Sequence, residues 1–203
     1  MQVKRSVTAE ARRTQIMAAA VECLVDLGYQ HTSYARIAER AELSSTRLIS
    51  YHFTAKDELM QAIVDRVFDR AKAAIRPRMA AVDAPAEKIA TFIRASLDWY
   101  AADRREVLAL REIWNNFRDP DGRLVLGPLI HEPEYEEVIG IFRAGQAAVE
   151  LRDFDPRAMA VALRSTLGGA SEQIFTHTDL DVPAYAEELV ALFDAATRKE
   201  ISG

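Results

Sequence analysis

The 203-residue chain is 49% apolar with only eight glycines and seven prolines, which suits one large or two small globular domains and excludes a fibrous or disordered chain. Its net charge of −5 argues, taken alone, against a nucleic-acid partner. The single cysteine, Cys23, excludes an internal disulfide, and no run approaches about 18 uninterrupted apolar residues, so we expect a cytoplasmic protein without a membrane span.

Apolar residues recur at helical spacing through the N-terminal third of the chain. A first helix from about Thr14 ends at Gly28, a residue that favours helix termini. Its apolar face comprises Ile16, Ala20, Cys23, Leu24 and Leu27. Thr32 or Ser33 can cap a second, short helix that runs through about Arg40.

A third short helix and a long fourth helix follow. Ser44 or Ser45 can cap the third helix, which runs through about His52. The fourth helix begins near Lys56, carries two acids in its first turn and continues to about Arg78.

The remainder of the chain is also predicted to be helical. Five more helices begin at Pro85, about Arg104, about Glu134, Pro156 and Pro183. Residues 120–133 hold three of the seven prolines and are predicted to form a loop. There is no repeat and no credible strand, so the fold class is all-α with about nine helices.

The second and third helices have the pattern of a helix-turn-helix. Isolated helices of about eight residues are unstable in water, so packing must hold them. Ile37 and Ala38 are expected on the inner face of the second helix. Leu43 is expected in the turn and Leu48 on the inner face of the third helix. The side chains left to face outward are Ser45, Thr46, Arg47, Ser50, Tyr51 and His52.

This outward set favours DNA, because Ser, Thr and Arg side chains reach base edges and phosphates. The alternative is a plain surface helix. The charge distribution agrees with DNA binding in sign: residues 1–60 hold eight basic and seven acidic residues, whereas the rest holds 18 basic and 24 acidic ones.

The stretch IAERAELS…LISYHFTAKDELMQAIV resembles the N-terminal domain of tetracycline-repressor-type (TetR) transcriptional regulators. The resemblance covers about residues 12–64 and includes Tyr51-His52-Phe53 followed by Lys56-Asp57-Glu58-Leu59. It implies a helix-turn-helix DNA-binding domain over 1–55 and a helical ligand-binding and dimerisation domain over 56–203.

The resemblance also implies the residues that contact DNA. Ser33, Ser44 and Lys56 match positions that contact phosphates, and Tyr51 faces a phosphate or a thymine methyl group. Arg47 has the side chain best suited to bidentate recognition of guanine. The complete predicted set is Ser33, Arg36, Ser44, Ser45, Thr46, Arg47, Ser50, Tyr51, His52 and Lys56.

Two features depart from the family pattern. Glu42 stands where the family usually has glycine in the turn; if its φ is positive, it costs about 1 kcal/mol relative to glycine and brings an acid close to phosphates. The stretch from Ala41 to Phe53 is also one residue longer than the common pattern, which leaves open which of Ser45, Thr46 and Arg47 reaches the bases.

In the C-terminal domain, the resemblance implies a pocket for a small-molecule inducer and a dimer interface. The aromatic residues predicted to bind the ligand are Trp99, Tyr100, Trp114, Phe117, Phe142 and Phe175. Ordinary core packing is the alternative for these residues. The homodimer would form through helices near 156–178 and 183–199, where Gly168 and Gly169 allow close helix approach or, alternatively, kink their helix.

The predicted function is a ligand-responsive transcriptional regulator, a repressor released from a palindromic double-stranded DNA operator by an inducer. An enzyme is not expected, because the four histidines lack metal-ligand spacing and there is no phosphate loop or nucleophile motif. Neither a cofactor nor a metal is expected. The alternative function is a helical protein-interaction module without DNA binding, which Glu42 and the acidic balance favour.

Overall fold

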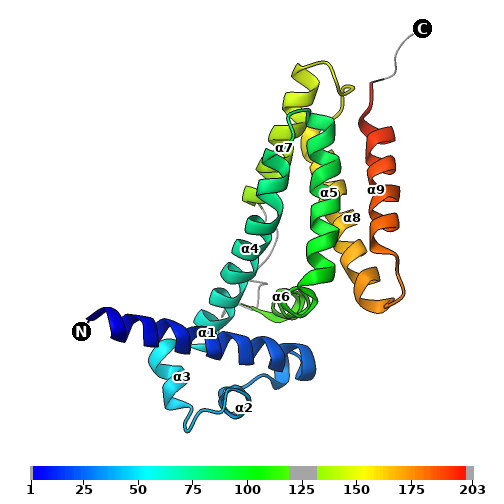
Figure 1. Cartoon of the computed structure of the whole chain (residues 1–203). Coiled ribbons are helices and arrows are strands. Elements are labelled where there is room, and N and C mark those ends of the chain that lie inside the picture. The colour runs from blue at the N-terminus through cyan, green and yellow to red at the C-terminus, as the bar shows by residue number, and fades with distance from the viewer. Residues whose placement is uncertain (1, 119–131, 200–203) are drawn as a thin grey trace. The chain divides into compact units, whose positions relative to one another are not determined.

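The structure is a computed structural model that describes residues 2–118 and 132–199 (Figure 1). The described residues form nine α-helices and one short 3-10 helix, with no β-strand among them, which confirms the all-α prediction. Two compact units are present. The first holds the described residues up to Asp69 with those from Arg105 to Arg118, and the second holds Arg70–Arg104 with the described residues from 132 on.

The first unit is built on α1 (Gln2–Leu27), against which η1 (Tyr29–His31), α2 (Tyr34–Arg40) and α3 (Arg47–His52) pack. It also contains the start of α4 (Lys56–Ala80) and all but the first residue of α6 (Arg104–Asn116). Its core includes the fully buried side chains of Ile16, Leu24, Ile37, Ile49, Phe53, Leu59 and Ile63. Helix α1 begins at Gln2 rather than near Thr14, because no glycine or proline interrupts residues 2–13.

The predicted caps of the short helices are partly confirmed. Ser33 is the N-cap of α2, where its hydroxyl accepts a hydrogen bond from the Arg36 N–H at 3.4 Å. At α3 the N-cap residue is Thr46, whose side chain makes no capping bond, while the Ser45 hydroxyl accepts from the Arg47 N–H at 3.1 Å. Helix α3 therefore starts later than either predicted cap implied.

The predicted inner face of α3 is wrong by one residue. Ile49 is 0% exposed, whereas Leu48, which was expected to face inward, is 37% exposed. Phe53 sets this register: it is fully buried, and Ile49, four residues before it, lies on the same side of the helix. Leu48 lies five residues before Phe53 and is rotated away from the core.

In the second unit, α5 (Pro85–Ala102) packs against α7 (Glu132–Ala147), α8 (Pro156–Thr176) and α9 (Val182–Thr197), and α7 also packs against α8. Aspartates begin the last two helices. Asp155 accepts hydrogen bonds from two N–H groups of α8, and Asp181 accepts one from the Ala184 N–H of α9. None of the described helices is both long enough and apolar enough to cross a membrane.

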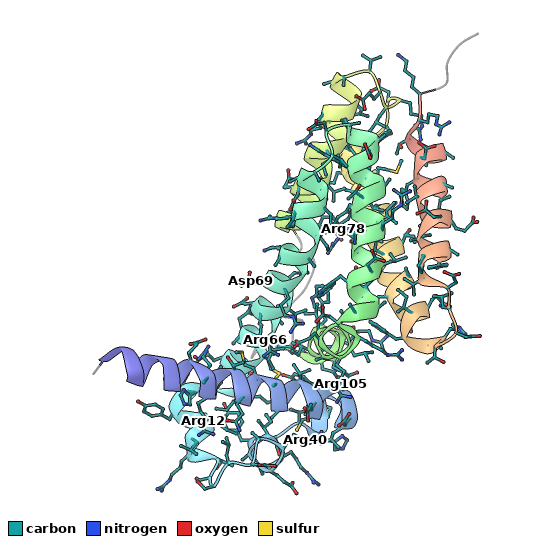
Figure 2. The ribbon with its side chains drawn as sticks, in the orientation of Figure 1. Arg12, Arg40, Arg66, Asp69, Arg78 and Arg105 are labelled. Atoms are coloured by element: carbon teal, nitrogen blue, oxygen red, sulfur yellow. The ribbon has the colours of Figure 1, made fainter. Side chains whose placement is uncertain are left out.

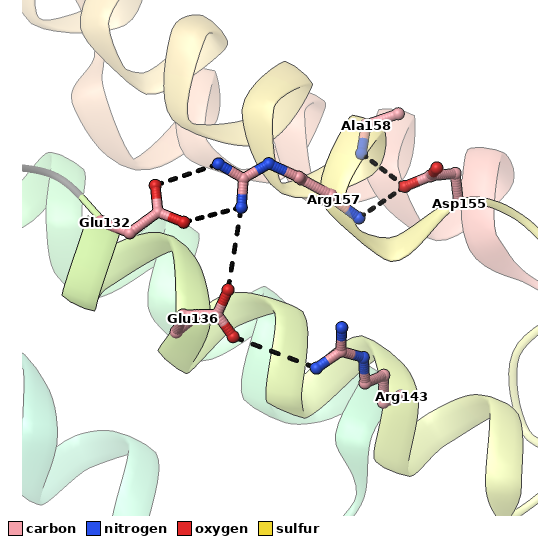
Figure 3. Close-up of polar contacts among 6 residues, drawn as sticks. All are labelled: Glu132, Glu136, Arg143, Asp155, Arg157 and Ala158. Atoms are coloured by element: carbon pink, nitrogen blue, oxygen red, sulfur yellow. Dashed lines mark hydrogen bonds and ion pairs between the residues drawn. The ribbon is translucent and has the colours of Figure 1, made fainter. Parts of the chain in front are cut away.

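Ion pairs join the beginnings of α7 and α8 (Figure 3). The guanidinium of Arg157 donates to both carboxylate oxygens of Glu132, at 2.7 and 3.0 Å, and lies 3.7 Å from Glu136. Helix α7 begins at Glu132, two residues before the predicted start, so the end of the predicted loop 120–133 is helical. The rest of that loop, residues 120–131, lies outside the described residues.

Helix α7 ends at Ala147, and the chain turns just beyond it. Val149 has a φ of 61° and is 59% exposed, beyond the last residue of the helix. The chain turns there because Leu151 packs back on Gly145, where an added Cβ would come within 2.5 Å of the Leu151 side chain. A side chain at position 145 would therefore force the turn apart.

We expect Ile49→Ala to lower the free energy of unfolding by about 2–4 kcal/mol, because it leaves a cavity in the core of the first unit. Leu48→Ala, on the exposed side of the same helix, is expected to cost less than about 1 kcal/mol. Urea unfolding followed by circular dichroism measures both. Equal losses for the two variants would contradict the register described here.

Candidate DNA-binding surface

Helix α1 holds the C-terminal ends of both short helices. The side chain of Arg13 donates from Nη1 to the backbone carbonyl of His52 at 2.8 Å, and its guanidinium lies 4.1 Å from the centre of the Phe53 ring. The amide of Gln15 donates to the carbonyl of Ala41 at 2.8 Å. These bonds satisfy carbonyls that α2 and α3 leave without helical partners, so they fix both helices relative to α1.

The turn between α2 and α3 is a Schellman motif. The Leu43 N–H bonds to the carbonyl of Ala38 at 2.8 Å, and the Glu42 N–H bonds to that of Glu39 at 3.1 Å. Glu42 occupies the left-handed position of the motif with a φ of 52°. The φ of Glu42 is therefore positive, as the sequence analysis allowed for, and this conformation costs about 1 kcal/mol relative to glycine.

The outward face of α3 carries the predicted contact residues. Ser44, Ser45, Thr46, Arg47, Ser50 and Tyr51 are all exposed. Arg47 and Tyr51, four residues apart, lie opposite the buried Ile49, and Tyr51 is 82% exposed. His52 is half-buried and contacts the Tyr51 ring edge to face, with the ring centres 5.2 Å apart.

The charges on this face favour a polyanion. From Leu43 to Ala55 the chain contains no acidic residue. The Arg47 side chain makes no ion pair within the described parts of the chain, so its guanidinium is available to a partner. Arg36, at the start of α2, lies 3.7 Å from Glu39, and both side chains are exposed. Such loose surface pairs contribute little and are easily exchanged for phosphate contacts.

Lys56 has a second use in the structure. Its Nζ donates to the backbone carbonyl of Tyr29 at 3.1 Å and lies 4.2 Å from the centre of the Tyr29 ring. Burial lowers the pKa of this half-buried ammonium group. Lys56 thus holds η1 to the start of α4, and its predicted phosphate contact stays a prediction.

The connection between α3 and α4 is also fixed. Both the N–H and the hydroxyl of Thr54 donate to the carboxylate of Glu58, each at 2.7 Å. These bonds, with the backbone N–H first, lower the pKa of Glu58. Because this linker is tied to α4, the end of α3 is held on both sides.

Ion pairs connect α6 to α1 and α2 inside the first unit, a feature that the sequence did not indicate. Asp26 of α1 accepts from Arg40 of α2 at 2.8 Å and from Arg105 of α6 at 2.9 Å. Figure 2 labels Arg40 and Arg105 near one another. The carboxylate of Glu112, also on α6, accepts from the Tyr29 N–H at 3.2 Å.

The pairs formed with Asp26 lower the pKa of its carboxyl group, the hydrogen bond from Arg40 first and that from Arg105 second.

The six aromatic residues predicted to bind a ligand are distributed over both units. Trp114 and Phe117 lie in the first unit, and Trp99, Tyr100, Phe142 and Phe175 lie in the second. The structure brings together the rings of Trp99 and Tyr100, whose centres are 5.5 Å apart, whereas Phe142 contacts Phe154. The ligand set therefore stays a prediction.

We expect stability to depend on the Asp26 carboxylate at neutral pH and not in acid. A lowered pKa in the folded state stabilises the fold above the ordinary value of 3.8 and loses that effect as the pH falls through the lowered value. Asp26→Asn should therefore unfold at lower urea than the parent protein at pH 7, and the gap should narrow below about pH 4. Glu39→Gln, in a looser pair, serves as the control; a gap independent of pH would speak against the pairs.

Comparison with known proteins agrees with this geometry. Residues 16–63 match the family described as "Bacterial regulatory proteins, tetR family". The HTH-type transcriptional regulator BetI of Burkholderia thailandensis is 34% identical over 90 residues, which span 44% of this chain and 46% of that protein. The chain thus matches less than half the length of this curated relative.

Solved structures share the fold over most of this chain. A tetR-family regulatory protein from Rhodococcus RHA1 superposes with a TM-score of 0.76 at 24% identity, covering 89% of this chain and 94% of that one. AibR in complex with isovaleryl coenzyme A and operator DNA gives 0.74 at 19% identity, covering 89% and 97%. The family match covers residues 16–63, which hold the helix-turn-helix described above, so this part of the chain is a domain of the tetR family of bacterial regulatory proteins.

Proposed function

We propose that the protein is a DNA-binding transcriptional regulator that works as a homodimer and releases its operator when a small molecule binds. The observation that carries the proposal is the outward face of α3. That face presents Arg47, Tyr51 and a set of hydroxyls with no acid between Leu43 and Ala55. Docked in the major groove, it would offer base-reading groups in the middle and phosphate-binding groups at its edges.

The supports of α3 make it suitable for this work. Base recognition needs side chains held at a defined depth in the groove, which a fraying helix cannot provide. The Arg13 bond to His52 and the Thr54 bonds to Glu58 fix the end of α3, while burial of Ile49 fixes its rotation. Ser33, at the exposed N-terminus of α2, is suited to a phosphate contact.

Release by a ligand is proposed to pass through α4. This helix is continuous from Lys56 to Ala80, and its residues fall in both compact units. A ligand that favours one position of α4 would change the spacing of the two α3 helices in a dimer. Operator affinity would then fall by the ligand's differential affinity for the two states. Repression is proposed over activation because the resemblance implies it.

The proposed ligand site lies in the second unit near Trp99. The Trp99 indole N–H is buried and has no hydrogen-bond partner within the described ranges. An unpaired buried donor costs about 1–3 kcal/mol, which an acceptor atom on a ligand would recover. The coenzyme A ester in the AibR complex shows what one protein of this fold binds. An acyl-coenzyme A is therefore a reasonable first class to test on this chain.

We expect a pool of random duplexes, selected at two salt concentrations, to yield an inverted repeat whose affinity falls steeply with salt. Arg47→Lys keeps the positive charge but loses the two-pronged guanidinium. It should keep the salt dependence and lose about tenfold or more in preference for guanine at one symmetric position.

Arg143→Lys, on α7 in the second unit, is the matched control and should select the same repeat as the parent protein. Absence of any enriched repeat, with no salt-dependent binding, would contradict DNA recognition. That outcome would favour the alternative function, a helical protein-interaction module. The strained, acidic Glu42 would then belong to a turn that does not contact DNA.

The dimer is proposed to form through α8 and α9. Helix α8 continues through Gly168 and Gly169, so the two glycines do not end it. A Cβ added at either glycine would meet no atom within 4 Å. Val161 of α8 and Leu192 of α9 are 43% and 55% exposed, which leaves apolar surface on both helices. Glycine costs about 1 kcal/mol in a helix interior, and close approach of a second copy would offset that cost.

We expect Gly168→Leu to weaken dimerisation at least tenfold, because its side chain would hold the two copies apart, without reducing the helix content of the monomer. Gly140→Leu on α7 is the matched control, since that glycine also lies in a helix, is exposed and has open space at its Cβ. Sedimentation velocity over a range of concentrations measures the association. If Gly168→Leu associates as the parent protein does, α8 is not at the interface.

A further inference from the structure

Helix α3 exposes two large side chains that carry apolar surface. Only six residues long, it nevertheless presents Leu48, 37% exposed, and Tyr51, 82% exposed. Leu48 is not the residue that anchors α3 in the core, because the neighbouring Ile49 is the one that is 0% exposed. Single exposed leucines are common on protein surfaces, so exposure alone carries no function.

The position of Leu48 on α3 indicates a role in the proposed DNA-binding surface. Leu48 and Tyr51 are three residues apart and are therefore neighbours on one side of α3. Arg47 and Ser50 flank them on the outward face, and both are exposed. The apolar patch formed by Leu48 and Tyr51 thus lies within the surface proposed to enter the major groove, where the absence of acids from Leu43 to Ala55 suits the flanking phosphates.

We infer that Leu48 reads a thymine in each half-site by contact with its 5-methyl group. This methyl is the one apolar group that a base presents in the major groove, and hydroxyls or a guanidinium gain little from it. Contact with this methyl group would remove apolar surface of the outward-facing leucine side chain from water, which is favourable. The inference rests on the proposed DNA binding and adds the residue that selects thymine at one position.

The test uses the selected inverted repeat and replaces each thymine in turn by deoxyuridine, which removes the methyl group and leaves every hydrogen-bonding group in place. With the parent protein, one symmetric position should lose about fourfold in affinity for each methyl removed, as expected for one buried methyl. With Leu48→Ala, the loss at that position should disappear while losses at other thymines remain.

Leu27→Ala is the matched control, because Leu27 is also 37% exposed but ends α1 rather than lying on α3. It should keep the full deoxyuridine profile of the parent protein. The measurement on the parent protein changes only the DNA, so misfolding of a variant cannot produce its result.

Identical deoxyuridine profiles for the parent protein and Leu48→Ala would overturn the inference while leaving DNA binding intact; Leu48 would then pack on deoxyribose or stay in water. A failure to select any duplex would overturn the proposed function as well. The two failures are distinguishable, because in the first the parent protein still selects and binds a repeat, whereas in the second no repeat is selected.

Discussion

The candidate DNA-binding surface depends on how a six-residue helix is kept folded. A helix as short as α3 has almost no stability of its own, since nucleation fixes several residues for a single hydrogen bond. Three contacts replace that missing stability: burial of Ile49 and Phe53, the bond from Arg13 to the carbonyl of His52, and the stacking of the same guanidinium on the Phe53 ring. All three act on the buried side or the C-terminal end of α3, and none of them uses the outward side chains of Arg47, Ser50 or Tyr51.

The turn before α3 shows how the same region tolerates an unusual residue. A Schellman motif requires a left-handed residue, and Glu42 supplies it at a cost that glycine would not incur. The hydrogen bonds of the motif and the Gln15 bond to Ala41 hold the conformation in place. Thr46 rather than a serine is the N-cap residue, and α3 starts at Arg47.

The sequence was sufficient for the class of fold and for most helix boundaries, because caps and apolar periodicity are local signals. Thr32 and Ser33 could be identified as candidate caps from their position, and the structure decides for Ser33. The exposed hydroxyls around Arg47 followed from the pattern. The register of α3 was missed because Leu48 and Ile49 are adjacent and equally apolar, and only Phe53, four residues beyond Ile49, decides between them. The predicted domain boundary between residues 55 and 56 does not coincide with the division between the compact units, which first falls after Asp69. That boundary stays a prediction about function.

The membership of α6 in the first unit has a consequence for how a regulator of this kind could respond. Arg105 and Glu112 of α6 bond to Asp26 and to the Tyr29 N–H, the same two residues that Arg40 and Lys56 bond from α2 and α4. A displacement of α6 would therefore act on the end of α1 and on η1, which precede α2 along the chain. Arg13 and Gln15 of α1 donate hydrogen bonds to the carbonyls at the ends of α3 and α2. Such a displacement would therefore act on both helices of the helix-turn-helix together. These are exposed or half-exposed polar contacts, each weak enough to be exchanged, whereas the buried contacts of Ile49 and Phe53 would keep α3 intact while it moves. A shift of the two short helices as one body is what the proposed change in the spacing of two recognition helices would require.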